Sequence, residues 1–267
     1  MNYKILLLII SFVFLLTNNA IAKKERIIIA STTSTYDSGL LKYLNEEYNL
    51  KSETKVHVIS LGTGQAIKLA ESGNADILIV HHTLTEIQFM KEGYGIIRHN
   101  LMYNDYILVG PNNDVEICNS IKKFLLNIIK NKLTFISRGD DSGTHKKELQ
   151  LWEAISIDLK ASWYLEVGSG MGRTLGMTIE LDGYTLVDSA TWISYKDKGS
   201  CKVLYQGDQA LSNQYSLILV NDKMHPHVNT KSATNFIEWL LSPDGQETIA
   251  RFELNGQQLF YPNADNF

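Results

Sequence analysis

The sequence is short of cysteine and has no excess of positive charge. Only two cysteines, Cys118 and Cys201, occur in 267 residues. Their spacing matches no metal-binding or redox motif and leaves open whether they form a disulfide or stay separate thiols. Lysine and arginine total 25 against 29 aspartates and glutamates, a net charge of −4. This balance argues against nucleic acid as a partner, and it means that an anionic ligand would have to be held by a local arrangement of donors.

Long apolar runs are also scarce, and the one at the N-terminus is too short to span a bilayer. Lys4 precedes a predominantly apolar run of twelve residues, Ile5 to Leu16, which is followed by Ala20-Ile21-Ala22. A membrane-spanning helix needs ~20 residues. A charged start, a short apolar core and small residues before a cleavage point are typical of a secretory signal peptide. Residues 1–22 are therefore predicted to be a signal that is cleaved near Ala22 and exports the chain to the periplasm.

The first part of the mature chain alternates short β-branched runs with helical patterns. Predicted strands cover Ile27–Ala30, Val56–Ile59 and Ala75–Val80, and a predicted helix covers Ala66–Glu71. After the first strand, four apolar residues fall at helical spacing on one face, namely Leu40, Leu41, Leu44 and Tyr48. Continuous apolar strands between helices are typical of a parallel sheet that is covered on both faces.

A second α/β series begins where this pattern resets, near Met102-Tyr103-Asn104-Asp105. A strand is predicted over Tyr106–Pro111, and the chain returns through a strand over Tyr215–Val220. The other predicted elements are helices over Ser120–Lys130, Thr144–Ile155, Gly172–Asp182, Ala233–Leu241 and Gln246–Phe252, and strands at Leu133–Ile136 and near Tyr184 and Val203. The sequence thus predicts two α/β lobes with mostly parallel sheets, joined by two hinge crossings. Lobe I would comprise residues 23–104 plus 213–267, and lobe II residues 105–212, with a ligand-binding cleft between them.

Three predicted strands end in small hydroxyl residues and glycine that lead directly into a helix. These segments are Ser31-Thr32-Thr33-Ser34, Gly62-Thr63-Gly64-Gln65 and the run from Ser137 to Thr144. Each can present unpaired backbone N–H groups and hydroxyls at a helix N-terminus, which together form an anion site. Taken singly, each is better explained as an ordinary N-cap that contributes ~1 kcal/mol. Their recurrence after successive strands favours a shared oxyanion site.

Arg138 lies inside the third segment and supplies a full positive charge in a planar fork of donors suited to oxyanions. An ion pair with Asp140 or Asp141 is the alternative, and both roles can hold together. A fourth segment, Gly168-Ser169-Gly170-Met171-Gly172-Arg173, is rich enough in glycine for a ligand to approach the backbone closely. It is not a dinucleotide fingerprint, because Arg173 stands where the last glycine is required, and plain turn chemistry explains it equally well.

A hydrolase and a metal site are two weaker hypotheses than the oxyanion site. Ser142, His145 and Asp140 suggest a Ser-His-Asp hydrolase, but Asp140 occupies the place of the first glycine in G-x-S-x-G. Ser142 and His145 are also three residues apart at a helix start, where capping is the commoner role. The adjacent His81 and His82 at a strand end point to opposite sides, which makes joint ligation of a metal difficult.

These segments together resemble those of the TupA-type tungstate-binding proteins of ABC importers. The resemblance extends from about Ile28 to Asn263. The matching segments are Ser31–Thr35, Asp37–Leu41, Gly62–Ala66, Val80–His82, Glu92–Gly95, Met102–Asp105, Ser137–Glu148, Trp163-Tyr164, Gly170–Gly172 and Gly256–Phe260. The resemblance implies a type II periplasmic-binding fold that closes like a hinge on unprotonated tungstate. It also implies a non-enzymatic, monomeric protein without a cofactor, whose partner is a permease in the inner membrane.

The expected ligand-binding set combines these segments with the resemblance. The family's threonine-rich first loop, selectivity arginine and helix-start donors correspond to Ser31–Ser34, to Arg138 and to Ser142–Thr144. The full set is Ser31, Thr32, Thr33, Ser34, Thr63, Gly64, Arg138, Ser142, Gly143, Thr144, Gly170 and Met171. The chain departs from the family pattern at Ser31, where threonine is usual, and at Ser169, where glutamine is expected.

Phosphate is the main alternative ligand, because phosphate-binding proteins of the same fold also carry an arginine followed by Ser-Gly-Thr. Phosphate keeps a proton near neutral pH and benefits from a carboxylate acceptor, which would repel tungstate. An unpaired Asp140 or Asp141 in the cleft would therefore favour phosphate, whereas capping or pairing with Arg138 would favour tungstate or molybdate. The sequence does not separate tungstate from molybdate, and a serine-dependent hydrolase is the most distant alternative.

Overall fold

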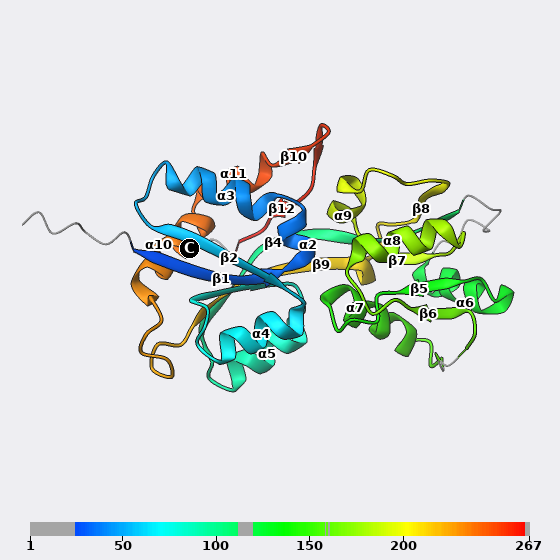
Figure 1. The fold of residues 1–267 in the computed structure, drawn as a ribbon, viewed down its shortest axis with the longest axis horizontal. Helices are drawn as coiled ribbons and strands as arrows, with labels where there is room; N and C mark the ends of the chain where they lie inside the picture. The colour runs from blue at the N-terminus through cyan, green and yellow to red at the C-terminus, as the bar shows by residue number, and fades with distance from the viewer. Residues whose placement is uncertain (1–24, 112–119, 158, 160, 265–267) are drawn as a thin grey trace, which may run out of the picture.

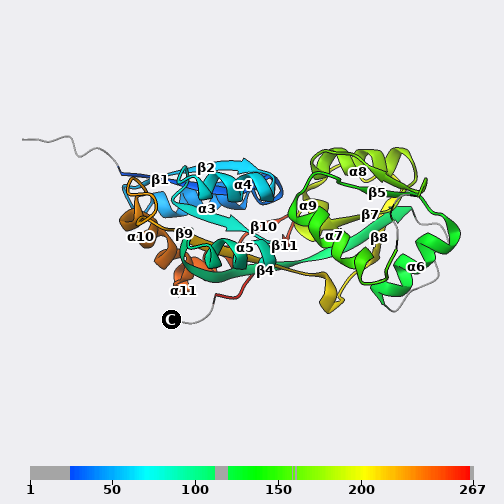
Figure 2. The ribbon, with the colours of Figure 1, turned by 90° about the horizontal axis from the view of Figure 1, so that it is seen from below.

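The computed structural model describes residues 25–111, 120–157, 159 and 161–264. The predicted signal peptide and Cys118 lie outside these residues. The described chain forms two lobes that lie one after the other along the longest axis of the molecule, and both of its ends lie in the same lobe (Figures 1 and 2).

The first lobe contains both ends of the described chain and is built around β1 to β3. Its elements are β1 (Arg26–Thr32), α2 (Thr33–Asp37), α3 (Leu40–Asn49), β2 (Lys55–Leu61), α4 (Thr63–Glu71), β3 (Ile77–Val80), α5 (Thr83–Lys91), α10 (Thr230–Leu241), α11 (Pro243–Ala250), β10 (Glu253–Leu254), β11 (Gln257–Gln258) and β12 (Tyr261–Pro262). The predicted helices in this lobe begin within about a turn of their observed starts.

Two long strands, β4 (Gly95–Pro111) and β9 (Ser212–Val220), connect this lobe to the second. The elements of the second lobe are α6 (Ile121–Asn131), β5 (Phe135–Ser137), α7 (Gly143–Glu153), β6 (Tyr164–Glu166), α8 (Met171–Glu180), β7 (Thr185–Asp188), α9 (Ser189–Ser194), β8 (Cys201–Tyr205) and the 3₁₀-helix η1 (Gln209–Leu211). Figure 1 shows β4 and β9 running from one lobe into the other.

Strands β1, β2 and β3 are parallel to their neighbours in this group, and the two crossing strands are antiparallel to every strand that they pair with. In the first lobe the order is β12-β4-β9-β3-β1-β2, with β1 parallel to β2 and to β3. The crossing strand β9 is antiparallel to β3 and to β4. In the second lobe β4 pairs antiparallel with β7 and β8, and β5 is parallel to β6.

Both faces of the first lobe's sheet are buried, as the apolar strand sequences predicted. Alternate residues of β3 point to opposite faces, so that Ile77 and Ile79 pack with α3 and α10, whereas Leu78 and Val80 pack with α4 and α5. The apolar residues at helical spacing in α3, namely Leu40, Leu41, Leu44 and Tyr48, are all buried. The prediction of an amphipathic helix there is confirmed.

The second lobe uses the same arrangement on the far half of β4. Tyr106 and Leu108 pack with α6 and α7, and Ile107 and Val109 pack with α8 and α9 on the opposite face. Strand β4 therefore contributes side chains to the cores of both lobes, so its backbone links the two cores directly.

The predicted strand start at Tyr106 is wrong, because β4 begins at Gly95 and passes through Met102–Asp105 without a break. These residues pair with β9, with Met102 opposite Tyr215 and Asp105 opposite Ser212. Polar side chains such as Asn104, whose Oδ1 accepts from Asn213 far along the chain, interrupt the apolar pattern expected of a buried strand. Helix α5, for which no element was predicted, lies between β3 and β4.

Among the described residues, no helix is long and apolar enough to cross a membrane. Cys201 is buried in β8. Because Cys118 lies outside the described residues, the pairing of the two cysteines stays open.

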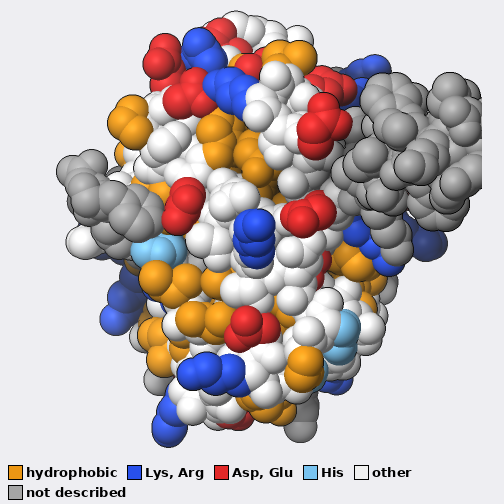
Figure 3. Space-filling view, turned by 90° about the vertical axis from the view of Figure 1, so that its left-hand side faces the viewer, with side chains coloured by type: hydrophobic (Ala, Val, Ile, Leu, Met, Phe, Trp, Pro, Cys, Tyr) orange, Lys and Arg blue, Asp and Glu red, His pale blue; other side chains and the backbone are white. Residues whose placement is uncertain are grey.

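The outer end of the first lobe carries acidic and basic side chains interspersed with one another (Figure 3). The visible face shows no area of a single sign. This distribution agrees with the small net charge and leaves local donors as the means of holding an anion.

Candidate functional site

Helix N-termini from both lobes meet at the junction between the lobes (Figure 1). In the first lobe α2 and α4 begin directly after β1 and β2, and in the second lobe α7 and α8 begin there. A cavity of about 410 Å³ lies between the start of α2 and the start of α8. Since a helix N-terminus presents free N–H groups and the positive end of the helix dipole, this junction is suited to an oxyanion.

The first predicted loop is divided between a strand and a helix. Ser31 and Thr32 are the last residues of β1, and Thr33 and Ser34 begin α2. The Ser31 hydroxyl donates to a backbone carbonyl of β3 at 2.8 Å, and the Thr32 hydroxyl caps α2. Thr33 and Ser34 line the cavity. The first pair therefore holds the loop in shape, and the second pair faces the space where a ligand could bind.

The start of α4 lies directly against the second lobe. Gly62 is its N-cap residue and provides no side-chain cap. The buried Thr63 hydroxyl accepts a hydrogen bond of 2.8 Å from the backbone N–H of Gly143, at the start of α7. A Cβ on Gly64 would lie 2.3 Å from the Asp141 carboxylate, so a larger residue would require that exposed side chain to move. The structure thus brings the predicted residues of α4 and α7 together.

Arg138 follows β5 and is almost completely buried, with 3% of its surface exposed. Its Nη2 and Nε donate to Asp140 Oδ2 at 2.6 and 3.2 Å. Asp140 Oδ1 accepts from the backbone N–H of Ser142 at 3.2 Å. A guanidinium has five N–H donors, and these two bonds to described residues leave about three of them for another acceptor.

The N-terminus of α7 is held by its own cap. The Ser142 hydroxyl accepts from the backbone N–H of His145 at 3.2 Å. Thr144 is buried, and its hydroxyl lies beside that of Tyr106 without a well-aligned hydrogen bond in the described part of the chain. A buried hydroxyl without such a bond is available to a ligand.

Asp141 pairs with a lysine of α7 and not with Arg138. Its backbone is left-handed with φ 57°, and its exposed carboxylate pairs with Lys146 Nζ at 3.2 Å. Asp140 pairs with Arg138 and Asp141 pairs with Lys146, so neither carboxylate stands unpaired at the junction. Because neither carboxylate is free to accept a proton from phosphate, this pairing favours an unprotonated oxyanion.

The start of α8 forms the opposite wall of the cavity. Gly170 is the N-cap residue without a side-chain cap, and Met171 is buried under the wall among apolar side chains. Ser169, Gly170 and Met171 all line the cavity. A Cβ at Gly170 or Gly172 would meet no atom within 4 Å, so packing within the protein does not require glycine there. The backbone of α8 is instead left open towards the cavity.

The charge of Arg138 acts on groups in both lobes. Burial raises the pKa of Asp37, on α2 of the first lobe, and the Arg138 guanidinium opposes that rise. Burial also raises the pKa of Asp188, at the end of β7, and Arg138 again lowers it. A single buried cation therefore lies within electrostatic reach of both walls of the junction.

Sequence reasoning missed Asp37, Asp188 and the role of His81 at this junction. Asp37 lines the cavity, and Asp188 caps α9 by accepting from the Thr191 backbone N–H at 2.9 Å. Asp188 follows a buried strand and precedes Ser189, so the pattern that revealed the other loops was present here too. Asp37 and His81 carry no such signal, because their importance comes from contacts between lobes.

Ser142 and His145 are not arranged as a nucleophile and its base. Ser142 Oγ accepts from the His145 backbone, and the His145 ring accepts at Nδ1 from the backbone N–H of Asp141 at 3.2 Å. His81 and His82 are also directed differently, with rings bonded to different partners. Within the described ranges, no group of three or more His, Cys, Asp or Glu side chains is placed to hold a metal ion.

Comparison with known proteins gives a consistent family. A model described as PBP superfamily domain matches residues 18–244. Tungstate-binding protein TupA of Peptoclostridium acidaminophilum is 43% identical over 248 residues, which cover 90% of this chain and 87% of the relative. TupA of Campylobacter jejuni is 39% identical, with coverages of 86% and 88%.

Two solved structures agree with these relatives. The tungstate-binding protein TupA of Desulfovibrio alaskensis has a TM-score of 0.81 and 38% identity, covering 90% of this chain and 100% of that one. A tungstate ABC transporter protein of Geobacter sulfurreducens has a TM-score of 0.78 and 41% identity, with coverages of 85% and 99%. The fold is thus a type II periplasmic-binding fold, and the chain belongs to the PBP superfamily and, within it, to the family of the tungstate-binding proteins TupA.

Proposed function

We propose that this chain binds tungstate, a tetrahedral oxyanion with two negative charges, outside the cytoplasmic membrane and passes it to an ABC importer. The names of its TupA relatives support this ligand. The structural observation that carries the proposal is Arg138, a buried guanidinium that keeps free donors at a junction of helix N-termini from both lobes.

The donors of this junction must act together to bind tightly. A hydrogen bond to a charged group contributes about 1.5 to 3 kcal/mol. A nanomolar Kd corresponds to about −12 kcal/mol, and association itself costs at least about 4 kcal/mol. Arg138 alone is therefore insufficient, and the proposed ligand set includes the starts of α2, α4, α7 and α8. This set is the twelve residues Ser31, Thr32, Thr33, Ser34, Thr63, Gly64, Arg138, Ser142, Gly143, Thr144, Gly170 and Met171.

Phosphate is the second candidate, and one observation favours it. Asp37 lines the cavity, and burial raises the pKa of its carboxyl, so it offers an acceptor that a protonated oxyanion could use. Against phosphate, the two carboxylates nearest to Arg138 in the sequence are both paired. Molybdate matches tungstate in charge and shape, so the same site accommodates it.

Transport needs a mobile, exported protein. We assign lobe I to residues 23–104 plus 213–267 and lobe II to residues 105–212, so that the crossings lie in β4 and at the start of β9. Residues 1–22 would direct export to the periplasm. The partner would be a permease in the inner membrane, and the monomer, without a cofactor or catalytic activity, would be the delivering species.

Calorimetric titration of the mature chain with sodium tungstate, molybdate, sulfate and phosphate tests the ligand. We expect tight binding of tungstate, weaker binding of molybdate, and no response to sulfate or phosphate. Phosphate binding as tight as that of tungstate would overturn the assignment.

Replacing Arg138 tests the residue that carries the proposal. Arg138→Lys keeps a charge beside Asp140 but loses the planar fork, so tungstate affinity should fall by about tenfold or more. Arg138→Ala should bind more weakly still and will also destabilise the fold, because Asp140 loses its partner. Arg251→Lys, at the exposed C-cap of α11, is the matched control and should bind like the parent. Unchanged titrations for Arg138→Lys would remove this residue from the site.

A further inference from the structure

His81 occupies the point where the two crossing strands, the first lobe and α7 meet. It directly follows β3, and its side chain is buried. Its Nδ1 lies 2.9 Å from Asn213 Oδ1 and 3.0 Å from the Tyr106 hydroxyl, and its ring stacks on Tyr215 at a centroid distance of 4.7 Å. Tyr106 belongs to β4, and the other two belong to β9. Both crossing strands therefore hold the imidazole.

The network around Asn213 fixes the protonation of His81. Asn213 Nδ2 donates to Asn104 Oδ1 at 2.7 Å and to the Tyr215 hydroxyl at 3.1 Å. Asn213 Oδ1 is consequently an acceptor, and His81 carries its proton on Nδ1. Burial lowers the pKa of His81 to about 4, which keeps the ring neutral at neutral pH. The ring is thus a rigid, uncharged body of fixed orientation.

The Cε1 corner of this ring lies against the start of α7. A Cβ built on Gly143 would be 2.7 Å from His81 Cε1, closer than side-chain atoms can approach. Gly143 is also the residue whose N–H donates to Thr63 at 2.8 Å. The position of His81 therefore limits where the N-terminus of α7 can lie relative to α4.

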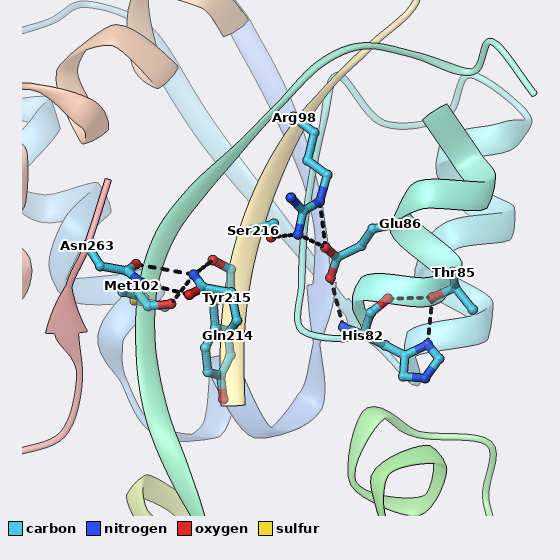
Figure 4. A network of polar contacts seen from close by, with 9 residues as sticks. All are labelled: His82, Thr85, Glu86, Arg98, Met102, Gln214, Tyr215, Ser216 and Asn263. Carbon is cyan, nitrogen blue, oxygen red and sulfur yellow. Dashed lines mark hydrogen bonds and ion pairs between the residues drawn. The ribbon is translucent and has the colours of Figure 1, made fainter. Parts of the chain in front are cut away.

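His82 contacts the same helix further along. Its Nε2 lies 3.3 Å from Gln150 Nε2 on α7. The Thr85 hydroxyl donates to the His82 carbonyl, so it accepts at 3.0 Å from the His82 ring Nδ1, which leaves Nε2 to accept from Gln150. The His82 backbone N–H donates to Glu86 at 2.8 Å, and Arg98 pairs with Glu86 at 2.7 Å (Figure 4). Contacts within the first lobe thus hold His82 in place, and its ring contacts α7 of the second lobe.

Both contacts lie on one face of α7. Gly143 and Gln150 are seven residues apart, which is about two helical turns. Lys147 lies on the same face, and these three residues line a cavity of about 370 Å³ together with His81 and His82. The two histidines touch this face two turns apart, which restricts both the position and the tilt of the helix.

We propose that His81 and His82 set the orientation of α7 from the first lobe, and that His81 is a positioning residue for the oxyanion-binding N-terminus of that helix. This inference rests on the proposed function, because it concerns the same site. His81 acts through Gly143 and not through contact with the ligand. The dipeptide His81-His82 thereby becomes part of the site, although neither residue supplies a charge or a hydrogen-bond donor to the anion.

A double-mutant cycle between His81 and Gly143 tests this proposal. Gly143 has an ordinary negative φ, so Gly143→Ala introduces only the clash with the imidazole. We expect Gly143→Ala to weaken tungstate binding by about tenfold, because the new methyl displaces α7. In the His81→Ala variant, the methyl group added at position 143 would occupy the space left by the imidazole. Adding Gly143→Ala to that variant should therefore change its Kd for tungstate by less than about twofold. Gly176→Ala in α8, where the nearest atom is 3.6 Å away, is the matched control.

The outcomes separate this inference from the proposed function. If the parent chain does not bind tungstate, the proposed function fails, and the inference that depends on it falls with it. If the parent binds and the two substitutions are additive in Kd, the inference alone is overturned. A clash that lowers thermal stability but leaves Kd unchanged also overturns it, since His81 would then be merely structural. Should His81→Ala not fold, His81→Asn retains a polar partner for Asn213 while removing the ring edge, and it takes the same place in the cycle.

Discussion

Glu148 is a buried acid whose ionisation should set the pH dependence of stability. It lies on α7 with 2% of its surface exposed. Its Oε1 accepts from the Tyr164 hydroxyl at 2.7 Å and from Trp152 Nε1 at 3.2 Å. Burial outweighs these bonds and raises the pKa of Glu148 from an ordinary 4.5 to about 7. The folded protein therefore holds this proton more tightly than the unfolded chain does.

The sign and size of the effect follow from linkage. Because the folded-state pKa is raised, the unfolded chain loses its proton first, and stability falls as pH rises from about 4.5 to about 7. At about 1.36 kcal/mol per pKa unit, the loss amounts to about 3 kcal/mol. Glu148→Gln stays neutral and keeps an oxygen for both donors. This variant should match the parent below pH 4.5 and exceed its unfolding free energy by up to about 3 kcal/mol at pH 8.

Urea unfolding followed by tryptophan fluorescence at several pH values between 4.5 and 8 measures this difference. Glu153→Gln, at the exposed end of the same helix, is the control and should change stability by less than about 0.5 kcal/mol at each pH. Parallel pH profiles for the parent and Glu148→Gln would refute the reasoning.

Two further substitutions probe single contacts. Ser142→Ala removes the N-cap of α7 and should lower the unfolding free energy by about 1 kcal/mol in chemical denaturation, whereas an unchanged value would mean that the cap contributes nothing. Arg98→Ala leaves the fully buried Glu86 without its cation and should cost about 3 to 5 kcal/mol in the same assay. Glu86→Gln should cost less, because the remaining Arg98 is partly exposed; equal losses would argue against an uncompensated buried charge.

Much of the fold could be predicted from local patterns. β-branched runs identify β1, β2 and β3, and apolar spacing identifies α3, because both faces of the first sheet are covered. The first half of β4 could not be found this way. Its Arg98 and Asn104 are polar, and they are stabilised by Glu86 and Asn213, which are distant in the sequence.

The candidate site divides in the same way. Ser142 and Gly170 were found because a strand, small residues and a helix start follow one another in the sequence. The contact between the start of α7 and Thr63 depends on how the two lobes are placed, and a local sequence pattern carries no information about that placement. His81 is the clearest case, since neither its place at a strand end nor its match to the family pattern indicates the contact with Gly143.

The continuity of β4 has a mechanical consequence. Its 17 residues run from one core to the other, and β9 pairs with it at the junction, where Asn104 lies opposite Asn213. In the described part of the chain, both connections between the lobes are strands, β4 and β9, and they are hydrogen-bonded to each other. A change in the angle between the lobes must therefore bend or twist this pair of strands. Because bending paired strands costs elastic energy, we expect the lobes to return to their starting angle once a force that changes it is removed.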